Sequence, residues 1–306
     1  MSKLVKTIIG FLLIALLFVF SCQKKDASNE ETMMKGKATI YVDESLVPII
    51  EDQVAVFENQ YDAKFHLVGK SEAEVINDLL NDTAKIAILT RKLSADELKA
   101  FQTKKIKPRT NVFATDAIAF IRNKKSNDTL IALKDVIDFM QGKEVKTIKG
   151  LVFDNPNSST VSYLKKISGI KMTNQKNIFS FKTNNDVIKH VAENDGMIGV
   201  VGINWIFQPE LIMQETVNKV NLLSVKGINS KDYVYPSQDK IGGGYYPLAR
   251  DLYIINCQGY TGLGMGFASF LGGERGQRII LKSGLVPVRF PTRKILTRKE
   301  ITKEIK

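Results

Sequence analysis

The feature that most constrains the fold is a regular alternation of two kinds of segment between residues 38 and 103. Three runs rich in β-branched and aliphatic residues lie at 38–42, 64–68 and 86–89. A segment with apolar residues at helical spacing follows each run, and Ser71 and Ser94 both precede a glutamate by three residues, which is a capping-box pattern. This alternation predicts an α/β protein with a mainly parallel sheet covered by helices.

The same alternation returns after residue 116. Further strands are expected at 117–122, 150–153, 197–201 and 253–256. Helices are expected at 133–140, 158–167 and 185–194, and a single long helix at 264–283. The chain of 306 residues is long enough for two domains of ordinary size.

The N-terminus carries a targeting pattern. Lys3 and Lys6 precede an apolar run at 8–20, which is shorter than the roughly 20 residues of a spanning helix. The run ends at Ser21-Cys22 and resembles a bacterial lipoprotein signal, which implies cleavage before Cys22 and lipidation of its thiol, for example by palmitate. An uncleaved anchor with an incidental cysteine is the alternative. The polar stretch 22–36 has too few apolar residues to fold by itself, which predicts a solvated tether.

The cysteine count bears on disulfide bonds, and the net charge bears on the kind of ligand or surface that the chain binds. The only other cysteine is Cys257, so a lipidated Cys22 excludes an intrachain disulfide. The formal charge of +12 falls to +10 when Lys3 and Lys6 are removed, and this excess suits an anionic ligand or an anionic membrane surface. An export signal and the lack of a basic motif with interleaved aromatics argue against nucleic acid.

Three predicted strands run into helix starts that are rich in hydroxyl groups. These segments are 43–45, 90–91 and 155–160. The first N–H groups of a helix are unpaired and carry partial positive charge, so they bind oxyanions readily. Simple helix capping is the alternative for each segment. Four consecutive small donors, Asn157 to Thr160, exceed what one cap requires, which favours a ligand there.

Six motifs in order give the chain a resemblance to the phosphate-binding proteins of ATP-driven phosphate importers, over roughly residues 37–289. They are Ile86 to Arg91, Asp116 to Phe120, Asn157 to Thr160, Gly196 to Val201, Tyr246 to Arg250 and Gly284 to Val288. The resemblance implies a two-lobed periplasmic-binding-protein fold of type II, with the ligand cleft between the lobes. Lobe one is then expected at 37–115 and 247–306, and lobe two at 116–246, after a signal peptide at 1–21 and the tether.

The resemblance also implies a ligand set. Ser45, Thr90, Ser158 and Thr160 are the expected hydroxyl donors, Asn157 belongs to the same run, and Ser159 is expected to contribute its backbone N–H. Arg91 is interpreted either as a charge-assisted ligand contact or as a salt bridge at the rim. Asp116 is expected to lie at the hinge.

Two departures from the family leave the anion open. No arginine precedes Ser158 where the family often has one, and Lys85 stands where it tends to have aspartate. We therefore expect Asp43 to accept the ligand's proton, with Glu44 second, and simple capping by Asp43 as the alternative. Sulfate, molybdate and tungstate remain alternatives to phosphate, and so does a sensor or interaction lipoprotein that kept the fold.

Catalytic patterns are poor, and the prediction is a binding protein rather than an enzyme. His66 lies between two apolar residues, and His190 precedes an apolar one. No set of side chains has metal-ligand spacing, and no nucleophile elbow occurs. No metal and no cofactor are expected. The expected partners are the oxyanion, ABC permease subunits and the membrane that holds the lipid, and the protein is expected to be a monomer on the extracytoplasmic face of the cell envelope.

Overall fold

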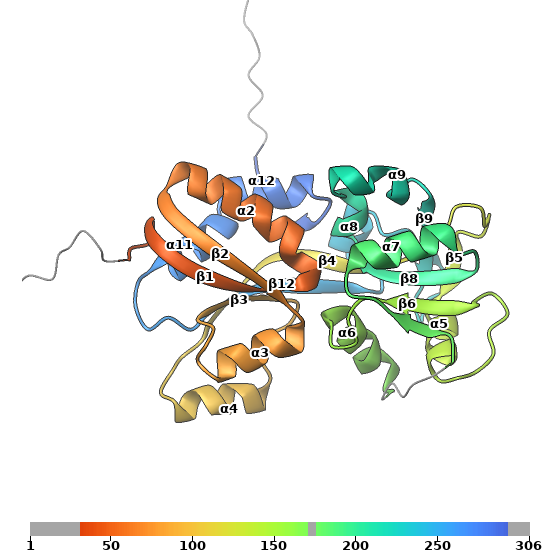
Figure 1. The fold of residues 1–306 in the computed structure, drawn as a ribbon, viewed down its shortest axis with the longest axis horizontal. Helices are drawn as coiled ribbons and strands as arrows, with labels where there is room; N and C mark the ends of the chain where they lie inside the picture. The colour runs from red at the N-terminus through yellow and green to blue at the C-terminus, as the bar shows by residue number, and fades with distance from the viewer. Residues whose placement is uncertain (1–30, 171–175, 293–306) are drawn as a thin grey trace, which may run out of the picture.

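The computed structural model describes residues 31–170 and 176–292. Figure 1 shows two α/β lobes side by side, linked by long strands that pass from one to the other. The predicted signal peptide, Cys22 and the first part of the tether lie outside the described residues.

Lobe one is built on the predicted alternation. Strand β1 (Lys35–Asp43) pairs in parallel with β2 (Asp62–Lys70) and with β3 (Ile86–Leu89). The helices that follow these strands are α2 (Val47–Gln60), α3 (Glu72–Leu80) and α4 (Ala95–Thr103), and a short 3-10 turn, η2 (Glu44–Leu46), precedes α2. The two capping boxes predicted at Ser71 and Ser94 are confirmed.

The C-terminal part of lobe one differs from the prediction of one long helix at 264–283. The segment forms two helices, α11 (Leu263–Leu271) and α12 (Glu274–Lys282). Gly272 and Gly273 separate them, and Gly273 has extended backbone angles at the start of α12. Two adjacent glycines cost about 1 kcal/mol each in a helix interior, which explains the break.

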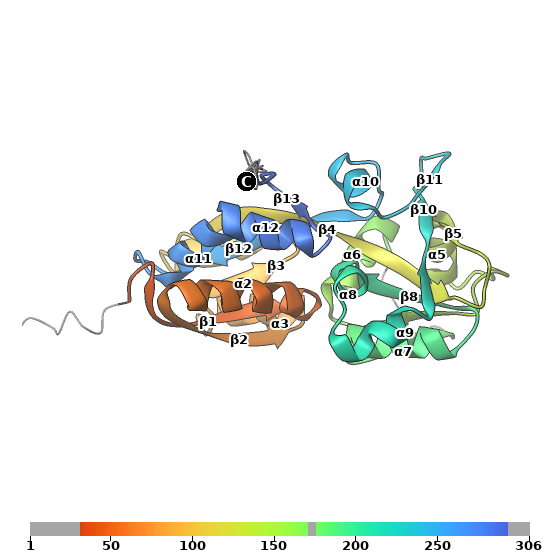
Figure 2. The same ribbon diagram turned by 90° about the horizontal axis from the view of Figure 1, so that it is seen from above.

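Two antiparallel strands cross between the lobes. Strand β4 (Arg109–Asn123) pairs with β12 (Ala249–Asn256) as far as Ala117, and from Ile118 onward it pairs with β8 (Met197–Gly202). Figure 2 shows β4 running through the middle of the molecule. The prediction of a strand at 117–122 captured only the second half of β4. The predicted boundaries at 115/116 and 246/247 remain a proposal, which this change of partner supports.

Lobe two repeats the α/β plan. Strand β6 (Gly150–Phe153) pairs in parallel with β7 (Ile178–Ser180) and with β8 (Met197–Gly202). Its main helices are α5 (Leu133–Met140), α6 (Ser159–Ser168) and α7 (Asn184–Glu193). The smaller elements of lobe two are α8 (Asn204–Phe207), η3 (Leu211–Met213), α9 (Gln214–Val217), β9 (Val220–Leu222), a small sheet of β5 (Leu130–Ala132), β10 (Ser224–Lys226) and β11 (Tyr233–Val234), and then α10 (Gln238–Gly242). Strand β13 (Val286–Pro287) pairs with the first half of β4, at Ala114 and Thr115.

The predicted tether is too long at its C-terminal end. Strand β1 begins at Lys35, because the chain there pairs with β2. Glu31 is also tied to the domain, since its carboxylate accepts hydrogen bonds from the backbone N–H of Leu263 at 2.7 Å and from Gln258 Nε2 at 2.9 Å. Among residues 31–170 and 176–292, no helix is long and apolar enough to cross a membrane.

Candidate functional site

The candidate site lies where the carboxyl ends of parallel strands from both lobes meet, which is the usual ligand position in open α/β sheets. Asp43 ends β1 and Ser45 lies in the turn that follows, whereas Ser159 begins α6 after strand β6. The lobes touch here directly. The carbonyl oxygen of Ser45 accepts hydrogen bonds from Trp205 Nε1 at 2.9 Å and from Asn204 Nδ2 at 3.2 Å.

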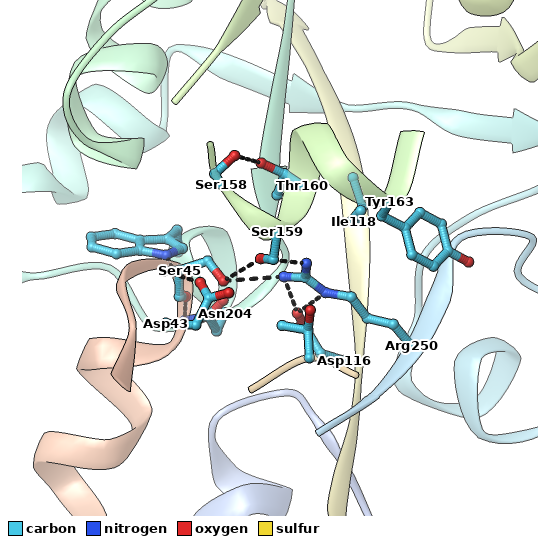
Figure 3. Close-up of polar contacts among 12 residues, drawn as sticks. Asp43, Ser45, Asp116, Ile118, Ser158, Ser159, Thr160, Tyr163, Asn204 and Arg250 are labelled. Carbon is cyan, nitrogen blue, oxygen red and sulfur yellow. Dashed lines mark hydrogen bonds and ion pairs between the residues drawn. The ribbon is translucent and has the colours of Figure 1, made fainter. Parts of the chain in front are cut away.

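Arg250 is the central cation of the site. Its buried guanidinium donates from Nη1 to Ser159 Oγ at 2.9 Å and from Nη2 to Ser45 Oγ at 3.2 Å. Nε and Nη2 also donate to Asp116 Oδ2, at 3.0 and 2.9 Å. The two serine hydroxyl oxygens are 3.3 Å apart, so one arginine holds a hydroxyl group from each lobe (Figure 3).

Sequence reasoning missed Arg250 as a site residue and used the motif Tyr246 to Arg250 only as one of the six motifs of the family resemblance. The register of the crossing strands explains its position, because Arg250 on β12 lies directly opposite Asp116 on β4. The signal was present in the sequence as a charged residue at the end of a motif that was already recognised. Asp116, expected at the hinge, is the buried partner of this arginine.

Asp43 uses its two carboxylate oxygens differently. Oδ1 accepts a hydrogen bond from the backbone N–H of Ser45 at 2.9 Å, which is the capping contact given as the alternative. Oδ2 is buried and has no hydrogen-bond partner among the described residues. A buried acceptor without a partner costs about 1–3 kcal/mol, so Oδ2 is a natural place for a ligand's O–H group.

The hydroxyl groups in the run from Asn157 to Thr160 have two different partners, Asp154 and Arg250. The hydroxyls of Ser158 and Thr160 both donate to Asp154 Oδ1, each at 2.6 Å, and Asn157 is exposed. Ser159 is the member whose hydroxyl reaches Arg250, although only its backbone N–H was expected to act. The N–H groups of the first turn of α6 have no partner within the helix, so they add positive potential at the same point.

Thr90 and Arg91 are engaged by carboxylates of lobe one. Thr90 Oγ1 donates to Glu72 Oε2 at 2.8 Å, and Arg91 Nε donates to Glu72 Oε1 at 3.1 Å. Arg91 also forms a bidentate pair with Glu97, at 2.9 and 2.8 Å. The salt-bridge interpretation of Arg91 therefore matches its contacts here, and a role for either residue toward a ligand stays a prediction.

Several carboxylates lie near Arg250, and they raise one another's pKa values. Burial raises the pKa of Glu44 to about 7, with Asp154 and Asp43 adding negative charge nearby. Burial also raises the pKa of Asp154 to about 6, and the hydroxyls of Ser158 and Thr160 oppose that rise. The pKa of Glu72 is raised by burial and then by Asp43. Such a site disfavours a fully ionised anion and suits a ligand that brings its own proton.

These shifts predict that the folded state loses stability as pH rises. Asp154 binds its proton more tightly when folded than when unfolded, where its pKa is about 4, so the loss begins near pH 4 and is complete above the folded pKa of about 6. The expected loss from Asp154 is roughly 2–3 kcal/mol. Carboxylates of lowered pKa, such as Glu97, are ionised in both states above pH 5 and do not contribute in that range.

Urea denaturation at pH 5 and pH 8 measures the part of this loss that lies above pH 5, which is about half of it, or roughly 1 kcal/mol for Asp154. Asp154→Asn is expected to flatten the pH dependence, whereas Asp96→Asn, which changes an exposed carboxylate, leaves it unchanged. Equal or greater stability at pH 8 in the unaltered chain contradicts the electrostatic picture of the site.

The comparisons with known proteins agree with this fold. Three solved structures illustrate the likeness. A Clostridium perfringens chain assigned as a phosphate ABC transporter substrate-binding protein, with bound phosphate, matches at a TM-score of 0.69 and 19% identity over 83% of this chain and 100% of its own. An ABC-type phosphate transport receptor from Vibrio cholerae matches at 0.63 and 17%, over 82% and 100%. The CcmR regulatory domain of Synechocystis PCC6803, in complex with 2-PG, matches at 0.52 and 13%, over 78% and 96%.

None of the curated protein sequences matches the chain. At these identities the solved structures establish the fold alone, and they confirm the prediction of a two-lobed α/β protein. The family model described as a PBP superfamily domain matches residues 27–275, which is most of the sequence. The chain therefore belongs to the PBP superfamily.

Proposed function

We propose that this chain is a solute-binding protein that captures an oxyanion between its lobes and delivers it to the permease subunits of an ABC importer. The observation that carries the proposal is Arg250, which lies between a hydroxyl group of each lobe, Ser45 and Ser159. An anion placed there gains charge-assisted hydrogen bonds and the field of the α6 N-terminus. Binding at a point shared by both lobes favours the closed arrangement, since the ligand contacts both sides at once.

Phosphate is the proposed oxyanion. Near neutral pH it still carries a proton, whereas sulfate, molybdate and tungstate do not. The unpartnered Oδ2 of Asp43 can accept a hydrogen bond from that proton, while a fully ionised oxyanion meets only repulsion there.

Trp205 offers a direct test, because it is the only tryptophan and its indole N–H donates to Ser45 across the two lobes. The side chain is buried, with the residue only 8% exposed, so a change in lobe separation alters its surroundings. We expect phosphate to shift the Trp205 emission in a saturable manner and sulfate to have little effect at the same concentration. Trp205→Phe should abolish the signal, and an equal response to sulfate contradicts the assignment of phosphate.

A second candidate function is favoured by a specific observation. Several predicted donors are already satisfied by the protein's own carboxylates: Thr90 and Arg91 by Glu72, and Ser158 and Thr160 by Asp154. This arrangement fits a sensor or interaction protein that kept the fold without tight anion binding. The same titration separates the two functions, since such a protein gives no response to any of the oxyanions.

We also propose that the chain is a lipoprotein held at the extracytoplasmic face of the membrane through Cys22. The motif Ser21-Cys22 after an apolar run and before a polar stretch supports this proposal. Several acyl chains hold a protein firmly, whereas one holds it only marginally. Cys22→Ala is therefore expected to move the protein from the membrane fraction to the soluble fraction or to leave its signal uncut. Unchanged mass and unchanged membrane association in this variant contradict the proposal.

A further inference from the structure

A cavity of about 860 Å³ opens beside the candidate site, and Ser159 and Arg250 form one end of its lining. This volume lies within the 300–1,000 Å³ typical of sites for small organic molecules. An inorganic phosphate has five heavy atoms, and each is about the size of one water, which takes roughly 30 Å³ of liquid. A bare oxyanion at Arg250 therefore leaves most of the cavity unfilled.

One face of helix α6 forms the wall from lobe two. Ser159, Ser162, Tyr163 and Lys166 all line the cavity, and their spacing of three and four residues places them in a row along the helix. The row leads away from the oxyanion end, first past polar and aromatic groups and then to a lysine. Along this wall a ligand therefore meets the anion donor Ser159 first, then the ring of Tyr163, and then the ammonium group of Lys166.

The other lining residues come from lobe one and β12, and they also include a lysine. Lys92 lines the cavity with its Nζ 5.6 Å from the ring centre of Tyr253, which also lines it. Neither Lys92 nor Lys166 has an acidic partner within 4 Å among residues 31–170 and 176–292. Each lobe therefore presents one uncompensated ammonium group to the same space.

Both arginines that line the cavity have carboxylate partners within the protein. Arg91 is paired with Glu72 and Glu97, and Arg250 with Asp116. Asp251 accepts hydrogen bonds from Thr115 Oγ1 at 3.0 Å and from Tyr253 OH at 3.1 Å. Hydroxyl donors leave the charge of Asp251 uncompensated, so the unpaired charges that line the cavity are the two lysines and this one carboxylate, with a positive balance.

We propose that the ligand is an organic phosphate monoester that carries a second acidic group, and this inference rests on the proposed oxyanion site. The phosphoryl group binds at Arg250 and Ser159, the two site residues that line the cavity. The organic part lies along Tyr163 and Tyr253, and the second acidic group lies between Lys92 and Lys166. The two lysines come from different lobes, so a ligand of this length contacts both walls along the whole cavity.

Calorimetry on the full chain tests the inference with three probes: 3-phosphoglycerate, glycerol 3-phosphate and inorganic phosphate. We expect 3-phosphoglycerate to bind at least tenfold more tightly than inorganic phosphate, with glycerol 3-phosphate in between. Lys166→Gln should weaken 3-phosphoglycerate about tenfold and leave inorganic phosphate unchanged. Lys165→Gln is the matched control, because Lys165 is the next residue of α6 and does not line the cavity.

The outcomes distinguish the proposed organic ligand from the proposed oxyanion function. If inorganic phosphate binds as tightly as 3-phosphoglycerate and Lys166→Gln changes neither, the organic ligand is excluded and the oxyanion function stands. If no probe binds, both proposals fail. Binding of 3-phosphoglycerate that depends on Lys166 and not on Lys165 supports the inference, even where inorganic phosphate binds weakly.

Discussion

Replacing Arg250 by glutamine is expected to reduce phosphate affinity at least a hundredfold and to destabilise the fold by about 3–5 kcal/mol. The affinity falls because Arg250 is the cation that joins Ser45 and Ser159, and no other cation contacts those hydroxyls in the described residues. The stability falls because the buried carboxylate of Asp116 is left without its partner. Calorimetric titration and urea denaturation measure the two effects separately.

Two further variants separate binding from stability. Adding Asp116→Asn to Arg250→Gln removes the uncompensated charge, so we expect stability to recover in part while binding stays lost. Arg122→Gln is the matched control, because Arg122 is equally buried and pairs with Asp128 within lobe two. This variant should lose stability and keep phosphate affinity. If Arg250→Gln binds phosphate as tightly as the unaltered chain, Arg250 is not part of the binding site.

The sequence predicted the parts of the fold that local pattern decides. Strands β1, β2 and β3 and the helices after them were expected from β-branched runs, helical spacing and capping boxes. The break between α11 and α12 was missed, although Gly272 and Gly273 mark it, because the apolar spacing continues on both sides. The first half of β4 was missed because its exposed end, Arg109 to Val112, lacks a hydrophobic pattern.

The candidate site was predictable only in part, because its key contacts join distant positions. Helix starts rich in hydroxyls can be found from the sequence, and Ser45 and Ser159 do meet. The position of Arg250 depends on the register of β12 against β4, which brings together residues 134 positions apart. The sequence pattern also does not reveal which carboxylate accepts a hydrogen bond from a predicted donor, as Glu72 does from Thr90.

Asp43→Asn is expected to weaken phosphate binding about tenfold and to let sulfate compete better than in the unaltered chain. The amide keeps an oxygen that can accept the N–H of Ser45, so the cap of the turn survives. At Oδ2 the variant loses the charge that accepts the ligand's proton and repels an ionised oxyanion. Competition between phosphate and sulfate, measured at one pH on each side of phosphate's second ionisation, gives the ratio.

The control for this prediction is Asp82→Asn, which changes an exposed aspartate that pairs with Lys85 far from the cleft. It should leave both affinities unchanged. If Asp43→Asn leaves the ratio of phosphate to sulfate affinity unchanged, Asp43 acts only as a helix cap. Another carboxylate, with Glu44 as the first candidate, must then accept the proton.

The most direct test of the central claim is a calorimetric titration of the unaltered chain with phosphate and with sulfate at neutral pH. Capture of a protonated oxyanion at Arg250 predicts one saturable phosphate site per chain and sulfate binding at least a hundredfold weaker. Sulfate bound as tightly as phosphate, or no heat from either anion or from any organic phosphate, contradicts the claim.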